Sequence, residues 1–122
     1  MKLTDESRAA TNTVRSYSPG EVRIGDASYT RSCVLAAQSI VTDWPPQSID
    51  ELQPEHLDTV LALQPELVIL GTGPQQRFPS PALMSKVLGR GVGLEVMDTG
   101  AACRTFNILI AEDRRAVAAL FL

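Results

Sequence analysis

The stretch Leu67-Val68-Ile69-Leu70-Gly71-Thr72-Gly73 decides the fold class that this sequence predicts. Its first four residues are all apolar, and Gly71 interrupts the run. A short, continuous apolar run is typical of a strand that is buried on both faces, as in the centre of a parallel sheet. We therefore expect residues 67–70 to form a central strand that Gly71 ends.

The segment before this strand has the pattern of a helix. Residues 55–64 place apolar side chains at helical spacing, and Pro54 and Pro65 suit the start and the end of that helix. His56 lies on this helix between two carboxylates, Glu55 and Asp58, so we expect it on the outer, solvated face.

The segments after the strand continue the alternation. Residues 116–122 are too short for periodicity to distinguish helix from strand, and we favour a strand. The resulting β-α-β-α-β order predicts an α/β fold with right-handed crossovers. The expected elements are a helix over 81–88, a strand over 94–97, a helix from Asp98 or Thr99 to about Ala111, and the strand over 116–122.

The first third of the chain has a different pattern. Alternating apolar and polar residues, with turn signals at Pro19-Gly20 and Gly25-Asp26, predict a β-meander. Residues 28–36 read as one strand of it and residues 39–42 as another. Trp44-Pro45-Pro46 ends the meander, either as a rigid corner or as an exposed docking point.

Length and charge limit the protein class. The chain has 122 residues, enough for one domain, which we place at residues 13–122 after a polar, flexible leader at residues 1–12. A net charge of −3 with scattered basic residues argues against nucleic-acid binding. No apolar run is long enough to cross a membrane or to act as a secretory signal, so we expect a cytoplasmic protein without an integral membrane segment.

Cysteine and histidine are too few for a metal centre. Cys33 and Cys103 are far apart in sequence and belong to no Cys-x-x-Cys pair, and His56 is the single histidine. We expect free thiols, no metal site and no cofactor.

A candidate anion pocket lies at the carboxyl ends of the two predicted parallel strands. There, Gly71, Thr72 and Gly73 follow one strand, while Asp98 and Thr99 begin a helix after the other. Ligands of open α/β sheets bind at such an edge, and helix N-terminal N–H groups attract anions. A purely structural reading is favoured: the glycines serve a tight turn and Asp98 or Thr99 caps the helix.

The helix that follows carries three further candidates. Arg104 lies on a largely apolar helix with Asn107 one turn further, and it needs either a bound anion or an internal partner such as Glu95, Asp98 or Glu112. Cys103 is read as a packed thiol rather than a nucleophile, because no base is placed beside it.

Several blocks of this sequence resemble a known family. The blocks are Val68–Gly73, Phe78-Pro79, Glu95–Thr99, Ala101–Leu109 and Glu112–Arg114, and the resemblance also includes Trp44. They resemble the small domain of unknown function that includes mitochondrial NADH:ubiquinone oxidoreductase assembly factor 3, the adipogenesis-associated homologue and many short bacterial and archaeal proteins. The resemblance implies a three-layer fold with an N-terminal β layer and a central mixed sheet flanked by helices.

The same resemblance carries the functional prediction. It implies no catalytic residue, and for the mitochondrial member it implies a role in assembling respiratory complex I through protein contacts. We therefore expect a bacterial binding or assembly-helper domain whose partners are proteins, including components of respiratory or membrane complexes. The alternative is an enzyme that binds a small molecule or an anion at the edge formed by Gly71, Asp98, Cys103 and Arg104.

Overall fold

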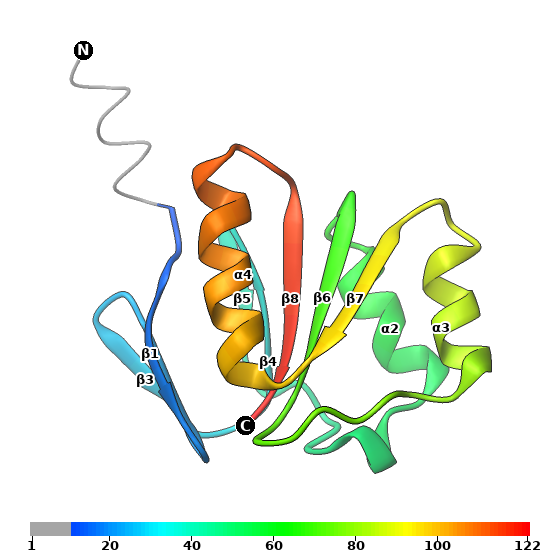
Figure 1. Cartoon of the computed structure of the whole chain (residues 1–122), viewed down its shortest axis with the longest axis horizontal. Helices are drawn as coiled ribbons and strands as arrows, with labels where there is room; N and C mark the ends of the chain where they lie inside the picture. The colour runs from blue at the N-terminus through cyan, green and yellow to red at the C-terminus, as the bar shows by residue number, and fades with distance from the viewer. Residues whose placement is uncertain (1–10) are drawn as a thin grey trace.

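The computed structural model describes residues 11–122, which form two sheets and the helices that cover them (Figure 1). Most of the predicted leader, residues 1–10, lies outside the described residues. Asn12 belongs to the packed part of the chain, since its backbone N–H donates to the Ala37 carbonyl at 2.8 Å. The elements are β1 (Val14–Ser18), β2 (Glu21–Ile24), β3 (Ala27–Tyr29), β4 (Cys33–Ala36), β5 (Ser39–Val41), η1 (Ile49–Glu51), α2 (Pro54–Leu61), β6 (Leu67–Thr72), α3 (Pro81–Leu88), β7 (Gly93–Met97), α4 (Thr99–Ala111) and β8 (Ala116–Phe121).

The N-terminal meander is shorter than the sequence predicts. Strands β1, β2 and β3 pair antiparallel in a small sheet of their own. The single strand expected over residues 28–36 is wrong, because Thr30, Arg31 and Ser32 separate β3 from β4. β4 and β5 join the second sheet, so the chain passes from one layer to the next at this break.

The central sheet is mixed, with strand order β5-β4-β8-β6-β7. β6 pairs parallel with both β7 and β8, and β4 pairs antiparallel with β5 and β8. β6 is therefore flanked by strands on both sides, as its apolar run predicts. The expected end of this strand at Gly71 is wrong: Gly71 and Thr72 continue the ladder to Met97 and to Phe121 of the neighbouring strands.

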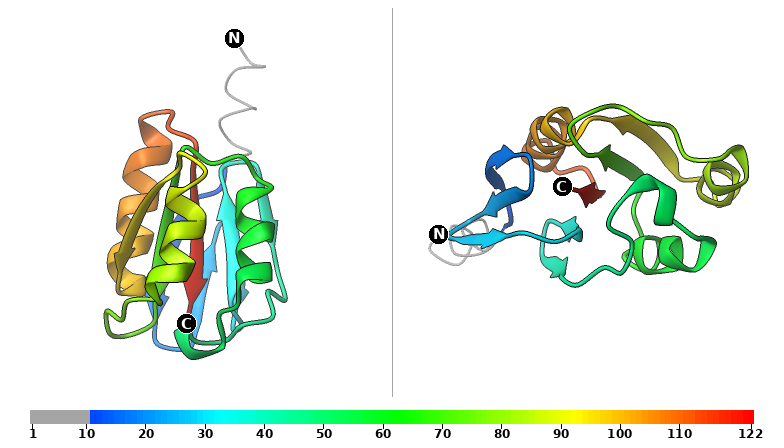
Figure 2. Two further views of the ribbon diagram at one scale, coloured as in Figure 1. Left: turned by 90° about the vertical axis from the view of Figure 1, so that its right-hand side faces the viewer. Right: turned by 90° about the horizontal axis from the view of Figure 1, so that it is seen from below.

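Both faces of this sheet are covered (Figure 2). The crossovers β6-α3-β7 and β7-α4-β8 run in opposite directions across the sheet. Since parallel crossovers are right-handed, α3 and α4 must lie on opposite faces. The small sheet and α4 form one outer layer, and α2 and α3 form the other, which confirms the three-layer fold.

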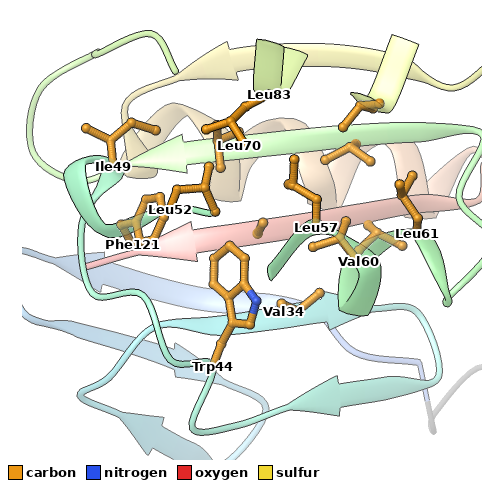
Figure 3. Packing of buried hydrophobic residues seen from close by; sticks show 14 residues of the cluster. Val34, Trp44, Ile49, Leu52, Leu57, Val60, Leu61, Leu70, Leu83 and Phe121 are labelled. Atoms are coloured by element: carbon orange, nitrogen blue, oxygen red, sulfur yellow. The ribbon is translucent and has the colours of Figure 1, made fainter. Parts of the chain in front are cut away.

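Side chains alternate between two cores along the sheet. In β8, Val117, Ala119 and Phe121 face α2 and α3, whereas Ala116, Ala118 and Leu120 face α4 and the small sheet. Trp44 lies in the first of these cores, 1% exposed and stacked on Phe121 with ring centroids 5.2 Å apart (Figure 3). Its indole N–H donates to the His56 carbonyl at 3.2 Å, so Trp44 is a buried anchor and not an exposed docking point.

The boundaries of the helices follow from their end residues. α3 begins after Ser80, whose hydroxyl accepts the Leu83 N–H, and it spans residues 81–88 as predicted. α2 spans residues 54–61, ending before the predicted Gln64.

His56 is half-buried: its Nδ1 accepts the Gln53 N–H at 2.9 Å and its ring lies edge-on to Trp44. The expectation of a solvated histidine on the outer face is therefore wrong.

Candidate functional site

The carboxyl ends of β6, β7 and β8 meet at one edge of the central sheet, where the sequence predicts a ligand crevice. The loop after β6 leads to α3 on one face, and Asp98 leads from β7 into α4 on the other. Loops that diverge in this way leave a crevice in many open α/β sheets. Here, direct contacts between the two loops occupy that position.

Thr99 makes these contacts. Its buried hydroxyl accepts the Gly73 N–H at 2.7 Å and donates to the Phe121 carbonyl at 2.5 Å, and its own N–H donates to the Gly73 carbonyl at 2.9 Å. One residue thus connects the ends of β6 and β8 to the first turn of α4. We call Gly71, Gly73, Thr99 and Phe121 the β6–α4 junction.

Gly71 is needed at this junction because of close packing. A Cβ atom at this position would lie 3.0 Å from Ala102 Cβ, Leu120 Cδ2 and Thr99 Oγ1. Gly73 has a positive φ of 93°, a conformation that glycine adopts without strain. Both glycines therefore have structural reasons to be there, and the close packing around Gly71 leaves no space for a ligand at that position.

Asp98 caps α4, as the sequence predicts. Its carboxylate accepts the Ala101 N–H at 2.9 Å, which satisfies one of the free N–H groups of the first turn. The Ala101 N–H is therefore no longer free to donate to a bound anion.

Cys103 is packed in the core beneath the junction. It is 4% exposed, and burial raises the pKa of its thiol to about 11, although the Arg104 charge lowers it in part. Burial also raises the pKa of the Cys33 thiol, to about 12. A nucleophilic cysteine needs a lowered pKa and access to solvent, so this environment does not support Cys103 as a nucleophile.

Arg104 and Asn107 point to different surroundings. Arg104 is exposed, with neither an ion pair nor a hydrogen bond to any residue from 11 to 122, so none of Glu95, Asp98 and Glu112 is its internal partner. The Asn107 amide binds β1 instead: it accepts the Val14 N–H and donates to the Val14 carbonyl, both at 2.8 Å. Asn107 thus attaches the small sheet to α4.

Open space at this edge lies on the other side of the β6 loop. The Thr72 hydroxyl accepts the Arg77 N–H at 3.0 Å and donates to the Gln75 carbonyl at 2.7 Å, so the loop folds back on the strand end. A cleft of about 370 Å³ lies between this loop and η1, lined by Thr72, Gly73 and Phe121 among others. Of the predicted pocket residues, Thr72 and Gly73 line it, and Asp98, Cys103 and Arg104 do not.

A second cleft adjoins the first, and Arg77 lines both. Its volume is about 420 Å³, and we call it the Phe78 cleft. Arg77 forms an ion pair with Asp50 of η1, with 2.6 Å between Nη2 and Oδ1. This arginine holds the pKa of the Asp50 carboxyl below its usual value, mainly through that hydrogen bond. The cleft is lined by Ile49, Asp50, Leu52, Gln53, Pro54, Arg77, Phe78, Pro79, Ser80, Ala82 and Leu83.

Phe78 is the residue at this edge that sequence reasoning missed as a site. Its side chain is 64% exposed, on a loop that Thr72 and Pro79 restrain. Residues 74–77 before it are all exposed as well. The signal for it was present: a lone aromatic residue in a loop rich in Gly, Pro and Gln.

Two further properties concern metals and membranes. Within residues 11–122, no three His, Cys, Asp or Glu side chains come together in a way that could hold a metal ion. In the same part of the chain, no helix has the length and apolar character needed to span a membrane.

Comparisons with known proteins confirm the resemblance. The "13 kDa major membrane protein" of Francisella tularensis is 28% identical over 117 residues, which cover 93% of this chain and 94% of that protein. NADH dehydrogenase (ubiquinone) 1 alpha subcomplex assembly factor 3 of Danio rerio is 30% identical over 122 residues, covering 98% of this chain and 70% of that protein.

A solved structure supports the fold. The crystal structure of a protein from Bordetella parapertussis superposes with a TM-score of 0.86 at 37% identity, covering 92% of this chain and 96% of that one. The family model described as "Protein of unknown function (DUF498/DUF598)" matches residues 14–121. The chain therefore belongs to the DUF498/DUF598 family of proteins of unknown function.

Proposed function

We propose that this protein is a non-enzymatic binding domain that assists the assembly of a protein complex, and that it contacts its partner through the Phe78 cleft. The observation that carries the proposal is the 64% exposed Phe78 side chain beside an open cleft. Aromatic residues, phenylalanine among them, are enriched at protein–protein interfaces, where a few residues in well-packed pockets carry most of the binding energy.

The floor of this cleft suits such a contact. Ile49 of η1, Leu52 directly after η1 and Leu83 of α3 line it and are each at most 9% exposed, so their positions are set by the core beneath (Figure 3). Rigid apolar groups lose little conformational entropy when a partner binds. The Arg77–Asp50 ion pair adds a polar rim.

The groups that an enzyme at the junction would use have internal roles. Thr99, Asp98 and Asn107 are each hydrogen-bonded to backbone groups, and the Cys103 thiol is buried with a raised pKa. A relative named as an assembly factor of NADH dehydrogenase favours the binding function, and we extend the proposal to respiratory complex assembly on that ground. We place the protein in the cytoplasm, where it would meet the exposed parts of such a complex.

An affinity pull-down tests this proposal. The tagged protein, its Phe78→Ser variant and its Ile108→Ser variant are each incubated with lysate and detergent-solubilised membranes of the cells that express it. Ile108 is a matched control, because it is 59% exposed on α4, away from the cleft. We expect respiratory-complex subunits with the wild type and with Ile108→Ser, and their loss with Phe78→Ser.

Thermal denaturation of the three proteins shows whether each is folded. Equal recovery of partners by the wild type and Phe78→Ser would overturn the assignment of the cleft. Recovery of no partner by the wild type would overturn the assembly function.

A further inference from the structure

The outer edge of β7 has backbone groups that no strand within residues 11–122 pairs. In this part of the chain, β7 is the terminal strand of the central sheet, and its ladder runs only to β6. Figure 2 (left) views the molecule from this side, where β7 lies between α4 and α3 with no strand outside it. Exposed edges of this kind accept an additional strand from another chain unless the protein protects them.

The direction of each backbone group follows from the register. Gly93 donates its N–H to the Glu66 carbonyl at 3.0 Å, so Gly93, Glu95 and Met97 turn their backbone groups toward β6. Because successive residues of a strand alternate, Leu94 and Val96 turn theirs outward.

One of these outward groups already has a substitute partner. The Gln76 side-chain amide donates to the Val96 carbonyl at 2.9 Å, in an exposed position. A carboxamide in this place mimics the N–H of a neighbouring strand. The N–H groups of Leu94 and Val96 and the Leu94 carbonyl have no such partner among residues 11–122.

Charge selects among the chains that could bind there. Glu95 is exposed in the middle of β7 and forms no ion pair with any residue from 11 to 122. Opposite charges across adjacent strands are favourable, and like charges are unfavourable. A second copy of this chain, paired antiparallel, would bring another Glu95 to the same face of the joined sheet, which disfavours self-association.

We propose that the outer edge of β7 binds an extended segment of a partner protein as an added strand, with a basic residue of that segment facing Glu95. This inference rests on the proposed function, since it specifies how the partner is held. The β6–α3 loop connects the two surfaces: Gln76 reaches the β7 edge, and Phe78 lines the cleft. A partner at Phe78 therefore lies close to the unpaired edge.

Amide hydrogen exchange measured by NMR tests the added strand residue by residue. The probes are a short acetylated peptide of alternating valine and lysine and a matched peptide of valine and glutamate. Without peptide, we expect Leu94 and Val96 to exchange faster than Glu95 and Met97. The lysine peptide should slow Leu94 and Val96 about fivefold, the effect of one added hydrogen bond of typical strength at each, and the glutamate peptide should not.

Two variants sharpen this test. Glu95→Lys should reverse the preference, so that the glutamate peptide protects Leu94 and Val96. Gln76→Ala should strengthen binding of the lysine peptide roughly fivefold, because it removes the competing amide.

Three outcomes would overturn the inference. If the amides of Leu94 and Val96 exchanged as slowly as that of Glu95 without peptide, the edge would not be available for an added strand. Equal protection by both peptides would remove the role of Glu95, and protection that grows with protein concentration alone would identify a second copy as the occupant. The peptide response of Phe78→Ser should equal that of the wild type, so failure at this edge is separable from failure of the Phe78 cleft.

Discussion

The two sides of the carboxyl edge of the central sheet use their residues differently. At the β6–α4 junction, the polar groups bind one another: Thr99 contacts Gly73 and Phe121, and the space above Gly71 is filled. At the Phe78 cleft, an aromatic ring and the backbone before it stay exposed. The comparison shows that polar side chains able to bind a ligand can instead hold the layers of the fold together. The binding surface is then provided by a loop with less reactive side chains.

Replacing Thr99 by valine should have the largest effect on stability. The variant keeps the shape of the side chain but leaves the buried Gly73 N–H and Phe121 carbonyl without this partner, at a cost of about 3 kcal/mol in the free energy of unfolding. Urea denaturation measures it. Thr105→Val is the control on the same helix, because within residues 11–122 that hydroxyl donates only to the Met97 sulfur, at 3.4 Å. Equal free energies of unfolding for the two variants would contradict the conclusion that the Thr99 hydroxyl stabilises the β6–α4 junction.

Replacing Asn107 by alanine should cost somewhat less, about 2 kcal/mol, since it removes two hydrogen bonds to partly buried backbone of β1. Hydrogen exchange should quicken in β1 and β2 more than in β6, because the small sheet loses its attachment to α4. Ile108→Ala, the next residue along, should change stability by at most about 0.5 kcal/mol. An unchanged exchange rate in β1 would show that Asn107 is not the attachment.

Raising the pH should weaken the core under the junction through the two thiols. Their folded pKa values, about 12 for Cys33 and about 11 for Cys103, lie above the ordinary value of 9.0. The stabilisation is complete below pH 9, where both states hold the proton, and is lost as the pH rises through the folded values. For each thiol, the free energy of unfolding should fall by about 1.4 kcal/mol per pH unit between pH 9 and the folded pKa of that thiol.

A variant with both cysteines replaced by alanine isolates this effect. Its stability should decline less steeply above pH 9, and the remaining decline includes Tyr17, whose pKa burial also raises. Parallel pH profiles for the wild type and the double variant would show that the thiols do not contribute.

Arg104→Ala should have the smallest effect, at most about 0.5 kcal/mol, because the side chain is exposed and forms no ion pair within residues 11–122. Thermal denaturation with and without inorganic phosphate also tests the predicted anion site. If phosphate stabilised the wild type but not the variant, Arg104 would be identified as a residue that binds an anion. A loss of several kcal/mol without phosphate would instead reveal an internal partner.

The elements with clear local patterns could be predicted closely. Helix α3 follows from Ser80, Pro81 and its apolar spacing, and the run at residues 67–70 identifies the central strand. The break between β3 and β4 could not be predicted, because three polar residues inside an alternating pattern do not reveal a change of sheet. The roles of Thr99 and Asn107 were missed for a similar reason: their partners lie 22 or more positions away in the chain.

The sequence by itself determined the α/β class, the order of most elements and the family, because periodicity, glycine, proline and short motifs act over a few neighbouring residues. Only the tertiary structure decided which predicted site residues are buried and which are open. The exposure of Phe78 and Arg104 and the closing of the junction by Thr99 depend on contacts between distant segments. Local patterns do not encode such contacts, since the same residue satisfies its hydrogen bonds with water in one packing and with backbone in another.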